Sequence, residues 1–312
     1  MTSEKIRQKR YGDLNIMDFQ VFFSSESACW ERLVGLRWPR GIRCLKCPDQ
    51  KQDFIRKRKV FECRGCGKQR SATAGTMFHK SRIPLKKWFW TIFLMATSKK
   101  GASMLYLQKQ LGLKSYRSAW LMGHKIRSAM LQRDEAYSLQ GIVEADEIFI
   151  GGKRNRETLR RTGTNKTPFL MAVEERDANR PRFLKVQELE DITLNSVVPA
   201  VEKLVQKGSK LKTDGAIAYR QAQKKGYDLE QSSYFQDPAK TQEHLKWVNT
   251  LTSNLKRFLL STYHGVYPKY RKAYLAEFAY RFNRRYWPRQ AFDRLLFACI
   301  NARAMTLPEL KA

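Results

Sequence analysis

The sequence predicts a mixed α/β protein in which a small metal-bound ribbon and a helical module precede an α/β domain. Two Cys-x-x-Cys pairs indicate the ribbon, two helical patterns around a glycine turn indicate the module, and alternating apolar residues after Gly141 indicate strands. With 312 residues, the chain is long enough for two domains and a small module. We expect an N-terminal helical segment at 1–40, a zinc ribbon at 41–76, a helix-turn-helix region at 77–138 and the α/β domain at 139–312.

The N-terminal part is expected to consist of helices around a short β segment. Asp18 can cap the first helix, and Pro39-Arg40-Gly41 ends it. Pro84 opens the second helix, since proline is tolerated in a first helical turn. A turn with Gly112 separates the last two helices, which is the pattern of a helix-turn-helix. The expected helices lie at about 14–38, 84–95, 103–111 and 116–131, and the short strands lie within 42–75.

The C-terminal part shows a different period. Residues 142–150 predict a strand that Gly151-Gly152 ends. Three strands, a helix, a strand and later helices indicate a mixed α/β domain. Further strands are expected at 169–174, 183–188, 210–214 and 226–235, and helices at about 193–207, 244–260, 268–286 and 289–304.

The charge of the chain points to a polyanionic partner. The formal net charge is +31, and from Cys63 to Arg133 there are 15 basic residues and no acidic one. Such a field favours nucleic acid, with an RNA- or membrane-surface-binding face as the alternative. The longest apolar stretch is about half of a bilayer span, and the N-terminus lacks an apolar signal region, so we expect neither a membrane helix nor a secretory signal.

The cysteine pairs predict a structural zinc site. Two-residue spacing lets both thiolates of a knuckle face one ion, and the intervening hairpin brings the second knuckle opposite the first. Four thiolates leave no open position for catalysis, and a disulfide or redox role is the alternative. Cys29 and Cys299 are expected to be buried apolar filler. The expected ligands are Cys44, Cys47, Cys63 and Cys66.

The second helix of the helix-turn-helix candidate carries basic residues on its polar faces. Arg117, Lys125 and Arg127 are expected to reach phosphates or base edges of DNA from a major groove. The alternative is an ordinary helical hairpin with no role in reading a sequence. A basic loop at 152–167 offers further candidates for the DNA backbone, namely Lys153, Arg154 and Arg156.

Two aspartates suggest a second metal site. Asp146 interrupts an apolar strand, where a carboxylate is unfavourable unless it is paired or binds a metal. Asp214 ends another predicted strand, and two such carboxylates on adjacent strands can bind Mg²⁺. Asn249 and Lys256 share one face of a later helix, where an amide oxygen and an ammonium can serve a metal and a phosphate. Turn formation by aspartate and a solvated helix face are the alternatives.

These motifs together resemble the insertion-sequence transposases of the ISXO-like group. The resemblance covers almost all of the chain from about residue 16. It implies a zinc ribbon followed by a DDE-type domain with a ribonuclease-H-like mixed sheet and flanking helices. The matching stretches are the two knuckles, VEADEIFIGGKR at 143–154, LKTDGAIAY at 211–219, HLKWVNTLTSNLKRFLLSTYHG at 244–265 and AEFAYRFNRR at 276–285.

The resemblance also implies roles for single residues. Asp146, Asp214 and Asn249 correspond to the three positions that bind Mg²⁺ (or Mn²⁺), and Lys256 corresponds to the lysine that follows them. Many relatives have glutamate at the third position, so Asn249 leaves the site with one negative charge fewer and a weaker hold on metal. Other carboxylates could contribute instead, and the candidates are Glu144, Glu147 and Glu243. His244 would reach the site only if the helix begins after it.

The function implied by the resemblance is that of a DNA transposase. It would bind terminal inverted repeats, cleave the ends of its element and transfer the 3′ ends to target DNA by two-metal chemistry. The alternatives are a domesticated or inactive DNA-binding regulator and a nuclease that cuts without joining. Double-stranded DNA is the expected partner, with assembly of a homo-oligomer on DNA, no membrane, and a location in the bacterial cytoplasm on the nucleoid.

Overall fold

The computed structural model describes residues 14–48, 50–151, 166–177, 180–232 and 243–311. Contacts divide the chain into two compact units. The first consists of Met1–Arg133 with Trp287–Leu310, and the second of Asp134–Tyr286 with the last two residues. The C-terminal segment 287–310 therefore packs with the N-terminal unit, whereas the sequence analysis places it in the α/β domain. No helix among the described ranges is long and apolar enough to span a bilayer.

Aromatic side chains explain why the C-terminal segment joins the first unit. The ring of Phe292 lies 5.0 Å from that of Phe19 and 5.4 Å from that of Phe23. An ion pair of 2.7 Å between Arg32 and Asp293 adds to this packing. The helices of this unit are α2 (Ile16–Phe22), α3 (Glu26–Arg37), α4 (Leu85–Thr97), α5 (Met104–Gln110), α6 (Tyr116–Glu135, whose last two residues belong to the second unit), α12 (Ala291–Asn301) and α13 (Leu307–Lys311), with the short turn η5 (Pro288–Gln290) before α12.

The helix expected at 14–38 is in fact two helices. Ser25 caps α3, because its hydroxyl accepts a hydrogen bond from the backbone N–H of Ala28 at 3.1 Å and stops the preceding helix. Asn15, and not Asp18, caps α2, because its side-chain oxygen accepts hydrogen bonds from the backbone N–H groups of Met17 and Asp18. The periodicity of apolar residues runs through this break, which is why it predicts a single helix.

A small antiparallel sheet holds the cysteine knuckles. Its strands β1 (Gln52–Ile55), β2 (Val60–Cys63) and β3 (Gln69–Ser71) pair in chain order. Aromatic residues anchor this sheet to α3, because the ring of Trp30 lies 4.6 Å from Phe54 and 5.4 Å from Phe61. The sheet thus gains an apolar support that its own few residues lack.

The second unit is built on a five-stranded mixed sheet with the order β6-β5-β4-β7-β8. The strands β4 (Ile142–Ile150), β5 (Thr167–Asp177) and β6 (Arg180–Glu188) are antiparallel neighbours, whereas β7 (Lys210–Asp214) and β8 (Asp228–Ser232) run parallel to β4. The mixed α/β class predicted from the sequence is confirmed, and β4 and β7 have the predicted bounds.

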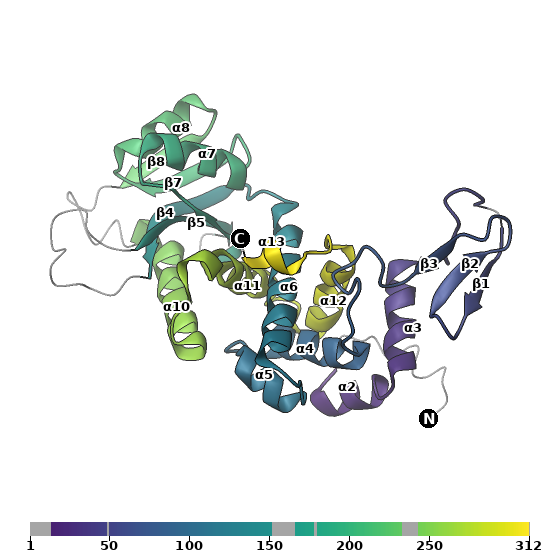
Figure 1. The fold of residues 1–312 in the computed structure, drawn as a ribbon. Coiled ribbons are helices and arrows are strands. Elements are labelled where there is room, and N and C mark those ends of the chain that lie inside the picture. The colour runs from purple at the N-terminus through teal and green to yellow at the C-terminus, as the bar shows by residue number, and fades with distance from the viewer. Residues whose placement is uncertain (1–13, 49, 152–165, 178–179, 233–242, 312) are drawn as a thin grey trace. The chain divides into compact units, whose positions relative to one another are not determined.

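Helices cover both faces of this sheet (Figure 1). Val143 and Ala145 of β4 face a core that includes α7, whereas Ile148 and Ile150 face a core that includes α10 and α11. Alternation along β4 therefore directs Glu144 and Asp146 to the face of α10 and Glu147 to the face of α7. The covering elements are α7 (Leu194–Leu204), η3 (Ile217–Tyr219) and α8 (Arg220–Lys224) on one face, and α10 (Lys246–Tyr263), η4 (Pro268–Tyr270) and α11 (Arg271–Asn283) on the other.

A buried amide fastens α11 to the sheet. Asn283 is 1% exposed, and its amide nitrogen donates to the Asp134 carboxylate at 3.0 Å and to the Leu184 carbonyl at 2.9 Å. Its amide oxygen accepts from the N–H of Leu184 at 2.7 Å. The Tyr137 hydroxyl accepts from the same nitrogen at 2.9 Å, so one side chain bonds α11, β6 and the segment before β4.

We expect Asn283→Ala to lower the free energy of unfolding by about 2–4 kcal/mol, because several buried polar groups lose their partner together. Urea denaturation followed by circular dichroism measures this change. Asn301→Ala is the matched control, since Asn301 is exposed and donates only within its own helix, and it should change stability by less than about 0.5 kcal/mol. Equal stability of the two variants would contradict the anchoring role.

Candidate functional site

The four knuckle cysteines come together in the structure. Their sulfur atoms all lie within 4.8 Å of one another, and the Sγ atoms of Cys44 and Cys66 are 3.6 Å apart. Among the described residues, this is the only group of three or more Cys, His, Asp or Glu side chains placed for a shared metal. The geometry fits a tetrahedral four-thiolate site, which supports a structural zinc ion.

Backbone N–H groups favour the thiolate form of two cysteines in this cluster. Burial raises the pKa of Cys63, but the N–H groups of Cys66 and Gly65 outweigh it and bring the pKa to about 6. The N–H groups of Lys46 and Cys47 likewise lower the pKa of Cys44. The first thiol of each knuckle is therefore favoured as thiolate, the form that binds zinc. Cys29 and Cys299 are 0% exposed, as expected for apolar filler.

We expect the purified protein to contain about one zinc ion per chain and Cys63→Ser to lose most of it, because three thiolates bind zinc far more weakly than four. Elemental analysis after gel filtration measures the zinc content. Cys299→Ala is the control, since Cys299 is buried far from the knuckles in sequence and should leave the zinc content unchanged. Zinc retained by Cys63→Ser at the level of Cys299→Ala would refute the site.

In the second unit, Asp146 and Asp214 lie where β4 and β7 stop pairing. The parallel register ends with Glu144 opposite Lys212, and two further residues along each strand bring Asp146 level with Asp214. The negative charge of Asp214 also acts on Asp146 and helps to raise its pKa, which agrees with the placement that the register gives. The two aspartates that the sequence singled out are thus brought together by the sheet.

The surroundings of Asp146 leave its negative charge poorly compensated. Burial, together with the charges of Glu147 and Asp214, raises its pKa to about 7, although the N–H of Glu147 opposes them with a hydrogen bond of 2.8 Å. Burial also raises the pKa of Glu147, although the hydroxyl of Tyr219 donates to it at 2.5 Å. A divalent cation would neutralise this excess charge, so the residues present fit a Mg²⁺ site that keeps several water ligands.

Glu144 connects the carboxylate strand to α10. Its side chain is 1% exposed, and one carboxylate oxygen accepts hydrogen bonds of 2.8 Å from the N–H groups of both Trp247 and Val248. These N–H groups belong to the first turn of α10, which has no cap from its own N-terminal neighbour, Leu245. Glu144 therefore caps α10 from the sheet, two residues from Asp146 on the same face.

The third and fourth sequence candidates lie on that helix. Asn249 follows directly after Val248, and both Asn249 and Lys256 are exposed. No hydrogen bond among the described residues joins Asn249 to Asp146 or Asp214, so its role as a metal ligand stays a prediction. His244 precedes α10, and its ring lies 3.2 Å from the Glu230 carbonyl oxygen on β8. The remaining carboxylate, Glu243, is exposed.

The helix-turn-helix residues are placed differently from the expectation. The helices α5 and α6 form, and Gly123 allows their close approach, since a Cβ there would lie 2.1 Å from the sulfur of Met104. Arg117 is exposed, but Lys125 is half-buried and donates to the Met77 carbonyl at 3.3 Å. Arg127 is 0% exposed, so the expectation that it faces DNA is corrected: α6 is buried around most of its circumference there.

Other candidates lie outside the described residues, namely Lys153, Arg154 and Arg156 of the basic loop. The structure in turn adds residues that sequence reasoning missed. Tyr219 is 0% exposed and lies beside Glu147. It belongs to the LKTDGAIAY stretch, in which the sequence analysis singled out only the aspartate. A buried tyrosine in a polar stretch is a weak signal, because tyrosines are common in cores.

Comparison with known proteins agrees with this arrangement. The ISXO2-like transposase domain family matches residues 138–283, and the transposase zinc-ribbon domain family matches residues 24–69. One similar protein is the uncharacterized protein in transposable element ISH50 of Halobacterium salinarum, which is 26% identical over 139 residues. That match covers 43% of this chain and spans 46% of the relative's length, which is less than half of it.

Both family matches fall on the structural features described above. The zinc-ribbon match contains all four clustered cysteines, and the transposase-domain match contains the five-stranded sheet with Asp146, Asp214 and α10. The chain thus carries a region that matches the transposase zinc-ribbon domain family, followed by a region that matches the ISXO2-like transposase domain family.

Proposed function

We propose that the protein is a DNA transposase that cleaves the ends of its element and transfers the freed 3′ ends to target DNA. The observation that carries the proposal is the juxtaposition of Asp146 and Asp214 at the end of the β4–β7 pairing, within a transposase-type domain. The net charge of +31 supports DNA as the partner, since each phosphate contact by Lys or Arg releases counterions.

We further infer a ribonuclease-H-like fold for the second unit. Three antiparallel strands followed by two parallel ones, with helices on both faces, support this inference. In such a sheet, the parallel neighbours β4 and β7 place their functional side chains at one edge, where a DNA strand has access.

Asp146, Asp214 and Asn249 would hold the metal ions. When bound, two Mg²⁺ or Mn²⁺ ions would activate the attacking oxygen and stabilise the leaving oxygen of a phosphodiester. Burial and like charges keep the pKa of Asp146 at about 7, so this carboxylate must release a proton before it can serve as a ligand at neutral pH. Glu144 fixes the start of α10 and thereby the position of Asn249, while Lys256 is free to neutralise a DNA phosphate.

The first unit would select the DNA. The zinc ribbon and α5–α6 would recognise terminal inverted repeats, with Arg117 as the exposed basic residue of the predicted set. Because two DNA ends must be joined to one target, we expect a homo-oligomer to assemble on DNA. The protein would act on the bacterial chromosome and therefore in the cytoplasm.

Strand transfer in vitro tests the proposal. Purified protein, Mg²⁺ and labelled DNA that carries the two flanks of the gene should yield products joined to a target plasmid. Cleavage without joining would favour a nuclease instead. If the protein binds DNA tightly but forms neither cleaved nor joined products, an inactive DNA-binding regulator is favoured. The neutral Asn249 at the third metal position suggests this alternative.

A further inference from the structure

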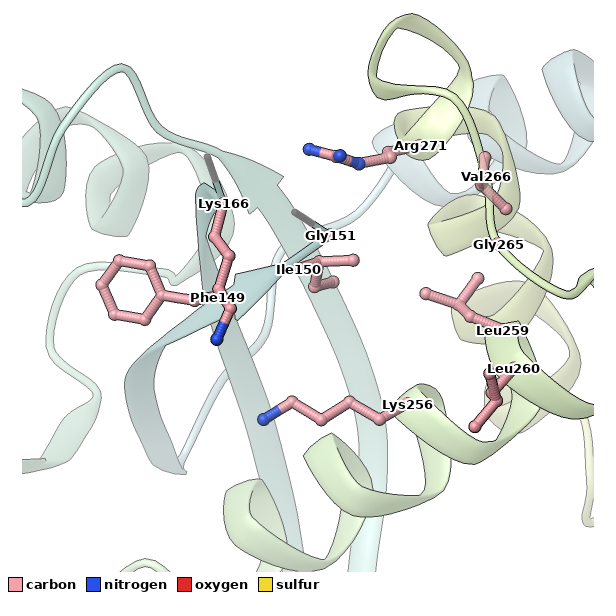
Figure 2. Close-up of a pocket in the computed structure, with 10 residues that line it drawn as sticks. All are labelled: Phe149, Ile150, Gly151, Lys166, Lys256, Leu259, Leu260, Gly265, Val266 and Arg271. Carbon is pink, nitrogen blue, oxygen red and sulfur yellow. The ribbon is translucent and has the colours of Figure 1, made fainter. Parts of the chain in front are cut away.

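A pocket lies where β4 ends, beyond the aspartates. Its volume is about 360 Å³, within the range of small-ligand sites. Ile150 and Gly151 of the strand end form one side, and Leu259, Leu260 and Val266 form an apolar wall opposite (Figure 2). The pocket thus has room for more than a bare ion.

Three cations and, among the described residues, no carboxylate line this pocket: Lys166 directly precedes β5, Lys256 lies on α10 and Arg271 on α11. Figure 2 shows the ammonium ends of Lys166 and Lys256 directed toward one space below Ile150, with the guanidinium of Arg271 above Gly151. Among the described residues, neither lysine forms an ion pair, so both ammonium groups are available to an anion.

Arg271 is buried and held in place by its neighbours, unlike an arginine at the surface. Its side chain is 5% exposed and donates to the hydroxyl of Thr167, while its Nε is buried with no hydrogen-bond partner among the described residues. Gly151 has φ of +86°, and a Cβ there would lie 2.0 Å from the guanidinium. Glycine is therefore required for the guanidinium to lie against this strand end. Burial lowers the pKa of Arg271, and the charge of Glu188 opposes that effect.

The rim of the pocket carries exposed apolar side chains. Leu260 is 69% exposed, although it is a large hydrophobic residue at the surface of a highly charged protein. Phe149 is 41% exposed, but its ring points away from the wall at Leu260 (Figure 2). Cations beside exposed apolar surface can bind single-stranded nucleic acid, because the cations bind the phosphate while the face of a base packs on the apolar side chains.

We propose that this pocket receives one unpaired nucleotide of a DNA strand, with its phosphate between Lys166, Lys256 and Arg271 and its base against the wall at Leu260. Ile150 lies four residues from Asp146 on the same face of β4, which corresponds to about 13 Å. A strand that crosses the aspartates would thus reach the pocket within a few nucleotides. The proposal rests on DNA being the substrate of the proposed transposase.

Binding of an eight-residue thymidine oligonucleotide, dT8, tests the pocket without chemistry. We would measure its Kd by fluorescence anisotropy for the wild-type zinc-loaded protein in buffer without Mg²⁺ or Mn²⁺ and without a chelator, which would remove the structural zinc. A dT8 analogue that lacks all bases serves for comparison. Lys166→Glu and Leu260→Ser alter exposed side chains, so both should fold. Lys225→Glu is the matched charge control, because exposed Lys225 follows α8, which packs with α7 on the opposite face of the sheet.

We expect Lys166→Glu to weaken dT8 binding about tenfold and Lys225→Glu less than twofold. Leu260→Ser should weaken dT8 binding about three- to tenfold and leave binding of the baseless analogue unchanged. Equal Kd values for Lys166→Glu and Lys225→Glu would contradict the binding of a nucleotide in this pocket. Equal weakening of both oligonucleotides by Leu260→Ser would contradict the packing of a base against Leu260. If the wild-type protein binds neither the oligonucleotides nor duplex DNA, the proposed function as a DNA transposase is itself contradicted.

Discussion

Asp146→Asn and Asp214→Asn are each expected to reduce Mg²⁺-dependent cleavage and strand transfer by at least about 1,000-fold. Each variant removes one of two carboxylates that converge at the end of the β4–β7 pairing. Metal-ion catalysis contributes several kcal/mol to transition-state stabilisation, and each 1.36 kcal/mol corresponds to a tenfold change in rate. Asparagine keeps the size of the side chain, so the loss would reflect the missing charge.

Binding of duplex DNA by these variants should stay within about twofold of the wild type, since one charge changes little in a chain of net charge +31. Asp228→Asn is the matched control, because Asp228 is exposed at the start of β8, four residues before the strand end that pairs with Asp214. It should retain full activity. Undiminished strand transfer by either catalytic variant would refute the assignment of the site.

The second large effect is expected for Glu144→Ala, which should lower strand transfer about 10- to 100-fold. The change leaves two N–H groups in the first turn of α10 without their buried acceptor, so the turn that carries Asn249 loses its fixed position on β4. A displacement of about 1 Å in a catalytic group is enough for a 100-fold loss. Product formation under single-turnover conditions measures the effect.

Three comparisons separate positioning from general unfolding. Glu144→Gln keeps an amide oxygen for the two N–H groups and should recover much of the activity. Glu190→Ala, an exposed carboxylate in the turn after β6, should behave as the wild type. Mn²⁺ should still bind to Glu144→Ala, because both aspartates remain. If Glu144→Gln is as inactive as Glu144→Ala, the charge rather than the hydrogen bonds of Glu144 matters, and the capping role is wrong.

Local sequence patterns were sufficient for much of the fold. The Cys-x-x-Cys spacing predicts which four sulfurs converge, because the short hairpin between the knuckles leaves few other arrangements. Alternation along 142–150 predicts both β4 and the shared face of Glu144 and Asp146. The pairing of β4 with β7 does not follow from either strand alone, since it depends on the long-range packing of β5, β6 and α7, which lie between them in the chain.

Other features depend on contacts that no local pattern encodes. Arg127 has the spacing of a solvated residue, yet packing around α6 buries it completely. The sequence offers Glu144 as a further carboxylate for the metal site, but it does not show that one oxygen of this carboxylate accepts hydrogen bonds from amides of a helix 103 residues away. The pocket at Gly151 joins residues from β4, α10 and α11, so only the folded chain shows that Arg271 and Lys256 face one space.

Binding of Mn²⁺ to the zinc-loaded protein tests the central claim, that Asp146 and Asp214 hold a divalent ion together. Electron paramagnetic resonance counts free Mn²⁺ in titrations of the wild type, Asp146→Asn, Asp214→Asn and the control Asp228→Asn. The wild type and the control should bind Mn²⁺ about tenfold more tightly at pH 8 than at pH 6. Asp146, with a pKa of about 7, is mostly protonated at pH 6, and it must lose this proton before it can bind the ion. Each catalytic variant should lose at least tenfold in affinity at pH 8, and Asp146→Asn should also lose the pH dependence. Equal Mn²⁺ affinity in all four proteins would contradict a shared metal site at these two aspartates.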